Sequence, residues 1–519
     1  MTFLLCNVKY SVMQDFSEKT RVIPAPTPRA AIVWSGALLC SFLGAAILFD
    51  ALPGVNWAIW IAAASGSVLL ARIAGDKRIE LPLAILLAWA TVLSFGLAVT
   101  GNDFIHFLIV ISDAMLLGLA VITVGSEYWS SLSAKLLVAV PILSPFRVWR
   151  ATAYEAADAP RPISSLRARS LIRGALLSVP LVVILIILLG NADPVIRWTT
   201  ERISAWLPDW SFPPRLLFFL FLLSITLGAN SLASRQTDPR LPNLPELNRR
   251  STVGLTEQRM MLWSAAVVLW IFVVLQISYF IQPPPVAVNS GVTFAEYARR
   301  GFGELSFAAT IVGAIILVLE YARPSDASEK DRTLLMRLEL ALLVALELVL
   351  FSAFRRVILY EQAYGFTTAR LFAQAYMLVM SLVLIALGIE VVRRSVSVAF
   401  GRRVAEIALG VFTVLVFWNY EAWIVNRNID RGVESGKFDL DYARRLSSDA
   451  IPTLVARRRE LGPEAAASIE KSIVCTRGST SRRWFEWNRR AEAQQDALLR
   501  AHPDPCPRGE SLRWWRHVD

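Results

Sequence analysis

The sequence is poor in charge and in side chains that bind metals. Only 18% of its 519 residues are charged, whereas a soluble chain of this length carries about a quarter. Its histidines, His106, His502 and His517, are too few and too scattered for most metal sites, and an iron oxygenase within a membrane would need several converging imidazoles. His-Glu-x-x-His, Walker and Gly-x-Ser-x-Gly motifs are lacking. The sequence therefore favours a protein that is not an enzyme, and we expect no metal and no cofactor.

The first segment of the chain also lacks the pattern of a cleaved signal peptide. Met1–Arg29 is polar and contains proline, without a charged stretch followed by an apolar core. We therefore expect the first apolar block to be retained. The net charge of +11 could suggest nucleic acid, but Lys and Arg lie mainly in short loops between apolar blocks. No continuous basic surface with stacking aromatics is expected, which argues against nucleic acid as a partner.

Long apolar blocks are what the sequence has in abundance. It is 55% hydrophobic, and stretches of about 18 or more apolar residues can each cross a bilayer core of about 30 Å as a helix. The pattern predicts an all-α, polytopic membrane helix bundle of about eleven spans, within a range of about ten to twelve. The expected spans are Ala30–Phe49, Asn56–Ile73, Leu81–Val99, Phe104–Val124, Leu171–Leu189, Arg215–Ala233, Met260–Ile281, Glu304–Tyr321, Leu334–Phe354, Leu371–Val392 and Val404–Val425. Leu137–Leu143 is apolar but too short to cross, and is expected at the interface.

The distribution of Lys and Arg predicts the orientation of these spans. With the N-terminus inside, the cytoplasmic segments hold about twenty-four Lys and Arg and the opposite loops about seven. This bias predicts a cytoplasmic N-terminus and an extracytoplasmic C-terminus, in the inner (plasma) membrane of a bacterial cell. The lipid bilayer is then the first partner.

The chain divides into three parts on this reading. Residues 1–29 form a polar N-terminal segment, 30–425 the transmembrane bundle, and 426–519 an extracytoplasmic tail. The tail is expected to be a soluble module of helical hairpins. Its expected helices are Asp439–Leu446, Ser447–Leu461, Pro463–Cys475 and Ser481–Ala501, with Pro463 as a first helical residue and Thr480 as the cap of the last helix.

Three ionisable residues within the spans are candidates for a polar path. A charge inside a membrane is costly, so each one is a functional hypothesis. Asp113 lies near the middle of its span, His106 lies about two turns earlier on nearly the same face, and Glu347 is deep in the ninth span. The alternative is structural: Asp113 bonds to a neighbouring helix and His106 reaches the outer interface.

Polar strings in the expected outer loops form a second candidate site. Their candidate members, one amide together with charged and aromatic residues, are Asn191, Asp193, Glu296, Tyr297, Arg299, Arg300, Glu304, Arg355, Arg356, Tyr360, Tyr364 and Arg431. Arginine binds phosphate and carboxylate through its planar fork, so these arginines could hold an anionic ligand. The alternative is that they pair with the nearby acids and lock the loops together. If the strings form one patch, Arg299 or Arg300 should lie close to Asp193 or Glu361.

These strings carry a resemblance to a known family. The chain resembles a bacterial multi-pass membrane family catalogued as domain of unknown function four-one-seven-three, related to four-one-five-three. The matching strings are Gly190–Pro194, Thr293–Gly301, Arg356–Thr367, Asn426–Arg431 and Leu440–Pro452. The chain departs from the family at Phe366, where leucine is common, and the resemblance covers about Leu171 to Val455. It implies a membrane protein without an established activity.

Two cysteines of the tail, Cys475 and Cys506, are candidates for a disulfide. Disulfides persist outside the cytoplasm, where we expect the tail to lie, and the other two cysteines precede or occupy the first span. A bridge requires the Pro-rich run before Cys506 to fold back, since its Cα atoms must approach within about 7 Å.

Three classes of function remain open. The first is a non-catalytic envelope receptor, scaffold or assembly factor, whose outer face binds an anionic ligand, a lipid headgroup or an envelope protein. The concentration of strings on that face favours it. The second is a transporter or channel with an intramembrane carboxylate path, and the third is a membrane-embedded enzyme that modifies a lipid.

Overall fold

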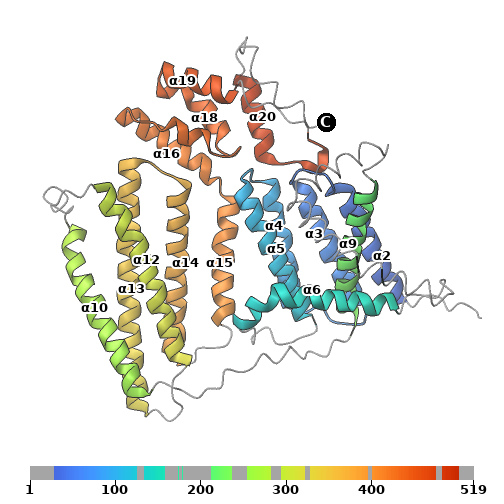
Figure 1. Ribbon diagram of the computed structural model, residues 1–519, viewed down its shortest axis with the longest axis horizontal. Coiled ribbons are helices and arrows are strands. Elements are labelled where there is room, and N and C mark those ends of the chain that lie inside the picture. The colour runs from blue at the N-terminus through green and yellow to red at the C-terminus, as the bar shows by residue number, and fades with distance from the viewer. Residues whose placement is uncertain are drawn as a thin grey trace, which may run out of the picture.

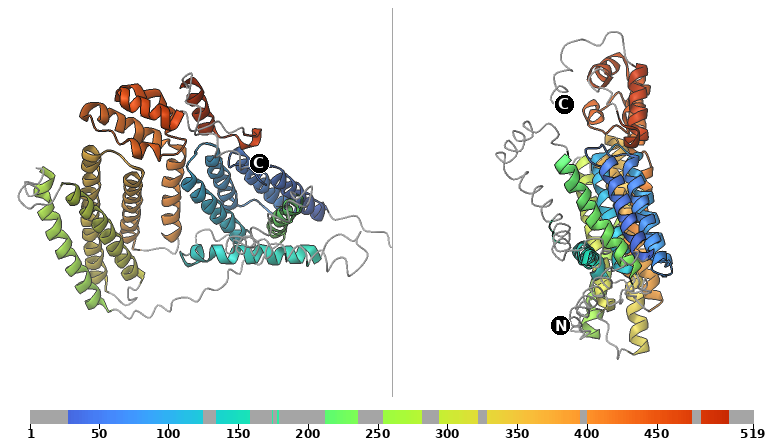
Figure 2. Two further views of the ribbon diagram at one scale, coloured as in Figure 1. Left: turned by 45° about the horizontal axis from the view of Figure 1, so that its top comes forward. Right: turned by 90° about the vertical axis from the view of Figure 1, so that its right-hand side faces the viewer.

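The computed structural model describes residues 28–124, 134–157, 174, 178, 212–235, 254–281, 294–321, 328–394, 400–474 and 482–501. Every regular element in that part of the chain is a helix. Long helices stand together as a bundle, and shorter helices from the end of the chain lie on one end of it (Figure 1). Seen edge-on, the bundle is thin, with the short helices stacked above it (Figure 2).

Eight helices are long and apolar enough to cross a membrane. They are α2 (Pro28–Ile47), α3 (Val55–Ala74), α4 (Leu81–Phe95) with η1 (Gly96–Ala98), α5 (Asp103–Thr123), α9 (Phe212–Ser234), α10 (Leu255–Ile281), α12 (Phe294–Tyr321) and α14 (Thr368–Val392). The protein is therefore an all-α, multi-pass membrane protein. The expected count of about eleven spans is not confirmed, because the described residues provide eight, or up to nine with one bent pair. Apart from Gly174 and Ser178, the expected span Leu171–Leu189 lies outside the described residues.

The ninth expected span, Leu334–Phe354, lies inside the longest helix of the protein. This helix, α13 (Glu329–Tyr364), has 36 residues and is about 54 Å long at 1.5 Å per residue. It carries Arg337, Glu339 and Glu347 within its apolar stretch, which separates it from the eight apolar helices. Since a bilayer core is only about 30 Å thick, α13 extends well beyond it.

The last expected span, Val404–Val425, is interrupted in the structure. α15 (Phe400–Phe417) ends before α16 (Tyr420–Ser435) begins, and the two axes are bent by 63°. Asn419 stands in the break and its side chain accepts a hydrogen bond from the amide of Ala422, at 3.1 Å. This cap starts a new helix in a new direction. The expected boundary after residue 425 therefore falls inside α16.

The spans form two groups with α15 between them (Figure 1). The first group consists of α2–α5 and α9, and the second of α10 and α12–α14, each packed around its own apolar core. α6 (Ala134–Ala157) lies across the end of the first group that is opposite the short helices. It contains the expected interfacial segment Leu137–Leu143 and exposes Ile142 and Phe146. We call this end the α6 face.

The short helices form the tail, and the opposite end of the bundle is the tail face. The tail continues from α16 with α17 (Leu440–Arg444), α18 (Ile451–Arg457), η3 (Arg458–Leu461), α19 (Pro463–Ile469), the π-helical η4 (Glu470–Val474), η5 (Trp484–Glu486) and α20 (Arg489–Ala501). α16, α18, α19 and α20 share an apolar core that includes Ile429, Leu454, Ile469 and Leu498.

The expected helix Ser481–Ala501 is wrong in its first part. η5 and a turn precede α20, because the Asn488 side chain accepts from the amides of Arg490 and Ala491 and starts the helix there. Pro463 is the first residue of α19, as expected. Thr480 lies outside the described residues.

Candidate functional site

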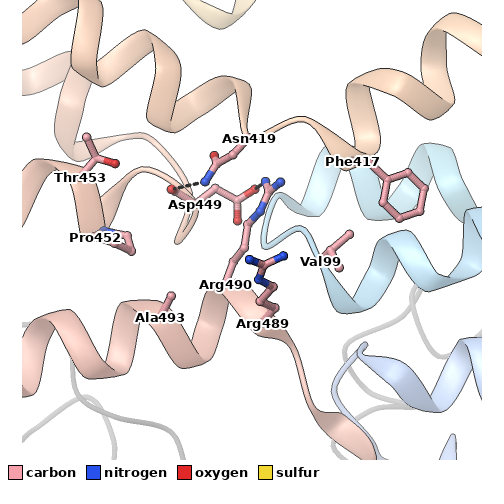
Figure 3. Close-up of a pocket in the computed structure, with 9 residues that line it drawn as sticks. All are labelled: Val99, Phe417, Asn419, Asp449, Pro452, Thr453, Arg489, Arg490 and Ala493. Carbon is pink, nitrogen blue, oxygen red and sulfur yellow. Dashed lines mark hydrogen bonds and ion pairs between the residues drawn. The ribbon is translucent and has the colours of Figure 1, made fainter.

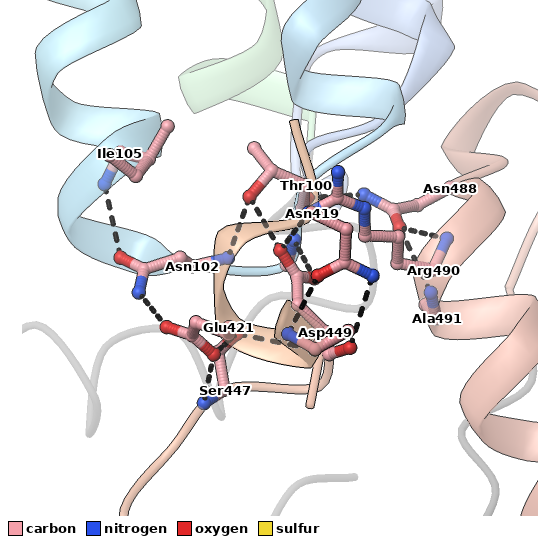
Figure 4. Close-up of polar contacts among 12 residues, drawn as sticks. Thr100, Asn102, Ile105, Asn419, Glu421, Ser447, Asp449, Asn488, Arg490 and Ala491 are labelled. Carbon is pink, nitrogen blue, oxygen red and sulfur yellow. Dashed lines mark hydrogen bonds and ion pairs between the residues drawn. The ribbon is translucent and has the colours of Figure 1, made fainter. Parts of the chain in front are cut away.

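A polar junction joins the tail to the first group of spans. It is built on the turn between α4 and α5, which the start of α16, the segment before α18 and the start of α20 all reach (Figure 4). We call it the tail junction, and its members are Thr100, Gly101, Asn102, Asn419, Glu421, Ser447, Asp449, Asn488 and Arg490.

Asp449 is the most connected residue of the tail junction. Its side chain is buried and accepts hydrogen bonds from Thr100 Oγ1 at 2.9 Å and from the Gly101 amide at 2.6 Å. Arg490 Nη1 lies 2.5 Å from Asp449 Oδ2, the oxygen that also accepts from Thr100. A Cβ at Gly101 would come within 1.7 Å of Ser448 Oγ, so a larger residue there would require the Ser448 side chain to move. The buried carboxylate is thus compensated by a guanidinium and two hydrogen bonds.

Glu421 forms the second half of the tail junction. It accepts from Asn102 Nδ2 at 2.6 Å and from the amide and hydroxyl of Ser447 at 2.8 and 2.6 Å. The Asn102 oxygen meanwhile caps α5 through the amides of Phe104 and Ile105. One asparagine therefore starts a span and holds α16 (Figure 4).

A second contact joins the tail to the turn between α13 and α14. The side-chain amide of Asn428 donates to Phe366 O at 2.8 Å and accepts from Phe366 N at 2.7 Å. Arg431 Nη2 donates to Ala363 O at 2.5 Å. Gly365, which has a φ of +85°, allows the turn to present these groups. Residues of two strings that looked like the family's, Arg356–Thr367 and Asn426–Arg431, thus serve to hold α16 on the second group.

A carboxyl group is buried beside this second contact. Glu361 Oε2 accepts from Gln374 Nε2 at 2.8 Å, and Oε1 has no hydrogen-bond partner among the described residues. Burial raises the pKa of Glu361 to about 7, although the Gln374 hydrogen bond and the charge of Arg370 oppose the rise. The Arg370 guanidinium lies 4.2 Å from the ring centre of Tyr360, and Tyr360 stacks on Tyr364 at 4.8 Å.

The other members of the expected outer patch lie apart from this contact or cannot be placed. Glu304 is exposed on α12, and Arg355 and Arg356 lie on α13 about one turn before Tyr360. Asn191 and Asp193 lie outside the described residues, and the side chains of Glu296, Tyr297, Arg299 and Arg300 are not described. The expected contact of Arg299 or Arg300 with Asp193 or Glu361 therefore stays a prediction.

The ionisable residues within the spans do not form one chain of contacts in the described structure. His106 Nε2 lies 2.8 Å from Thr100 O at the tail face. Asp113 is buried on α5, and neither of its oxygens has a hydrogen-bond partner among the described residues. Glu347 belongs to α13 in the second group, where it accepts from Ser381 Oγ at 2.7 Å. Within the described part of the chain, no hydrogen bond or ion pair links these three residues to one another.

The cysteine prediction cannot be placed. Cys475 and Cys506 lie outside the described residues, so their disulfide stays a prediction. Within the described ranges, no group of three or more His, Cys, Asp or Glu side chains is arranged to hold a metal ion.

A groove between α18 and α20 opens directly above the tail junction. It consists of a cavity of about 350 Å³ beside Asp449 (Figure 3) and a second of about 580 Å³, which share Pro452 and Ala493 in their walls. Small residues of α20, Ala493, Ala497 and Ala501, leave the space open. We call it the α18–α20 groove. Its charged lining residues are Arg458, Arg459, Arg489, Arg490, Arg500, Asp449 and Asp496.

Two of these arginines have no anionic partner among the residues that the structure describes. Arg490 is paired with Asp449, Arg458 with Glu470 at 2.9 Å and Arg500 with Asp496 at 3.6 Å. Arg459 and Arg489 are exposed, and no hydrogen bond or ion pair is formed by either side chain within the described part of the tail. The groove therefore carries excess positive charge. The sequence analysis did not predict this groove. A signal was present, because Ala493, Ala497 and Ala501 follow Arg489 at intervals of four residues and therefore lie on one face of the helix.

Comparison with known proteins places the chain in a family. No curated protein and no solved structure matches it. A family of unknown function is matched over residues 83–456, which is more than half of the 519-residue chain. The match includes most of the spans and the tail junction as far as Asp449. Of the two families in the resemblance it is the one numbered four-one-five-three; bacterial origin and kinship with four-one-seven-three stay predictions. The chain belongs to the family described as Domain of unknown function (DUF4153).

Proposed function

We propose that this protein is a non-catalytic receptor or scaffold of the bacterial inner membrane, which binds an anionic ligand on its extracytoplasmic face. The observation that carries the proposal is the α18–α20 groove with the unpaired Arg459 and Arg489. A guanidinium offers paired donors that match phosphate or carboxylate oxygens. A cavity of this size also falls in the range of small-molecule sites, about 300–1,000 Å³.

The positive-inside rule supports the extracytoplasmic position of the groove. The α6 face gathers cations from segments far apart in the sequence. Arg29 and Arg235 both pair with Glu155 of α6, Arg259 pairs with Asp331, and Arg394 with Glu329. A cytoplasmic α6 face puts the tail face, and with it the groove, on the other side of the membrane.

The lining of the groove favours binding over catalysis. Both carboxylates of its lining are engaged: Asp449 accepts from Arg490, Thr100 and Gly101, and Asp496 pairs with Arg500 at 3.6 Å. A general base must be able to reach a substrate proton. A carboxylate whose oxygens already accept from other parts of the protein stabilises the fold and is not free for that role. The groove thus supplies cations for recognition, while Asp449 serves the tail junction.

One observation favours the transporter as a second candidate. Asp113 is buried among the spans without a hydrogen-bond partner in the described residues, and such residues often mark ion or proton paths in membranes. Its distance from the tail separates the two hypotheses, because a change at Asp113 cannot touch a ligand in the α18–α20 groove.

Titration of the purified full-length protein with inorganic pyrophosphate tests the proposal. We expect the double variant Arg459→Gln/Arg489→Gln to bind pyrophosphate at least tenfold more weakly, since each lost charged hydrogen bond contributes about 1.5–3 kcal/mol. Arg445→Gln is the matched control, because Arg445 is an exposed arginine of the tail outside the groove. Asp113→Asn should bind like the parent protein.

The opposite pattern would sink the proposal. Equal affinities in the double variant and in Arg445→Gln would show that the groove does not recognise anions. A loss in Asp113→Asn with no loss in the double variant would favour the transport hypothesis.

A further inference from the structure

We infer that the anion bound in the α18–α20 groove is the headgroup phosphate of an anionic phospholipid, which reaches Arg489 from the outer leaflet. This inference rests on the proposed function and adds the class of ligand. It concerns the cavity beside Asp449, where the groove meets the spans (Figure 3).

The first argument is the depth of this cavity in the membrane. Two of its lining residues, Val99 and Phe417, directly follow or end helices of the bundle. Val99 comes after η1, where the apolar span beginning at Leu81 ends, and Phe417 is the last residue of α15. The wall formed by Val99 and Phe417 is therefore apolar, and it lies at the membrane boundary, where lipid headgroups are found.

The second argument is the arrangement of the cations. The Arg490 side chain points to Asp449, and the Arg489 side chain extends beside it, on the side of Val99 (Figure 3). Within the described residues, Arg489 is thus the cation without an anionic partner that lies nearer to the apolar wall of this cavity. A phosphate beside Arg489 would find positive charge, with room toward Val99 and Phe417 for the first carbons of a lipid.

The third argument is a set of exposed tryptophans near the same level. Trp418 follows Phe417 in the α15–α16 break and is 38% exposed, and Trp484 in η5 is 75% exposed. η5 packs against the turn between α2 and α3, because Glu486 accepts from the amide of Leu52 at 3.2 Å. Tryptophan is enriched at the headgroup level of membranes, so two exposed tryptophans at the tail face agree with a headgroup level there.

A water-soluble phosphate compound shares the recognition chemistry but not the apolar wall. Arg489 would serve both ligands, whereas Val99 and Phe417 can contribute only to a ligand that carries hydrocarbon. Affinity should therefore depend on the acyl chains as well as on the phosphate.

The test uses the delipidated full-length protein in a neutral detergent. It measures the binding of dioctanoyl phosphatidylglycerol, of glycerol 3-phosphate and of zwitterionic dioctanoyl phosphatidylcholine. We expect phosphatidylglycerol to bind at least tenfold more tightly than either of the other two. Arg489→Gln should lose at least tenfold in affinity for phosphatidylglycerol, while Arg445→Gln keeps it. Circular dichroism shows whether each variant keeps its helices.

Two results would overturn the inference in different ways. Glycerol 3-phosphate binding as tightly as the lipid, with the same dependence on Arg489, would leave the proposed anion receptor standing and remove the lipid. Equal binding of the two lipids, unchanged in Arg489→Gln, would remove the lipid site altogether. Pyrophosphate binding then decides the proposed function separately.

Discussion

Buried carboxyl groups in this protein differ in what compensates them. Asp449 has a guanidinium and two hydrogen bonds, and Glu486 has the side chain and amide of Arg483 together with the amide of Leu52. Asp113 has no partner among the described residues, and Glu361 has only Gln374 on one of its oxygens. The first two therefore stabilise the folded tail, whereas the last two cost free energy and point to a role other than stability.

Glu486 provides a test that depends on pH. Burial alone would raise its pKa, but the hydrogen bonds and charge of Arg483 and the amide of Leu52 outweigh burial and hold the pKa below its usual value of 4.5. A carboxyl group with a depressed pKa stabilises the fold above the usual value, and this contribution is lost as the pH falls through the lower, folded-state pKa. We expect the melting temperature of the parent protein to fall more steeply below about pH 4.5 than that of Glu486→Gln.

Thermal melting in detergent between neutral pH and pH 3 measures this difference. Glu464→Gln is the control, since Glu464 is exposed on α19 of the same tail and should leave the slope unchanged. Parallel curves for the parent protein and Glu486→Gln would contradict the assigned role.

At the scale of elements, the tail is attached at three turns of the bundle. It contacts the α2–α3 turn through Glu486, the α4–α5 turn through Asp449 and Glu421, and the α13–α14 turn through Asn428. Each contact uses a polar side chain on the backbone or cap of a turn. Two of these turns belong to the first group of spans and the third belongs to the second group, so the tail connects the two groups.

Loss of the Asp449 carboxylate should release the tail from the α4–α5 turn. Asp449→Ala leaves the partly buried Arg490 without its partner, which costs at most the roughly 3–5 kcal/mol of a fully buried unpaired charge. We expect trypsin to cleave the tail of this variant at least tenfold faster while the spans remain protected. Asp441→Ala, which removes an exposed acid paired with Arg444 at 3.3 Å, should change the rate little. Equal cleavage rates in the two variants would show that the tail junction does not hold the tail.

The sequence predicted the spans better than the tail, for a physical reason. α3 runs from Val55 to Ala74 where Asn56–Ile73 was expected, because a long apolar run admits few other structures in lipid. The break at Asn419 was missed, since the apolar pattern continues through it and only the capping ability of one side chain marks the bend. The tail junction was missed as well, because its partners are more than 300 residues apart in sequence.

At the scale of the whole molecule, two groups of spans share one α15 and one tail. The tail face holds the polar contacts and the α18–α20 groove, and the α6 face holds the cations paired with Glu155, Asp331 and Glu329. This asymmetry is what the proposed function requires, with anchoring on one side and recognition on the other. The Lys and Arg pattern predicted the cations of the α6 face, whereas no local pattern predicted the groove, because the groove depends on how α18 and α20 pack on each other.

The sidedness of the tail is the central claim, and labelling of single cysteines with a membrane-impermeant maleimide tests it most directly. A reporter fused after Asn426 would interrupt α16, so point substitutions are preferable. In a variant with all four native cysteines replaced by serine, Lys437→Cys probes the tail and Lys330→Cys the α6 face, both at exposed lysines. We predict that intact cells are labelled at Lys437→Cys and that Lys330→Cys reacts only after permeabilisation. Labelling of Lys330→Cys in intact cells, with Lys437→Cys protected, would contradict the account.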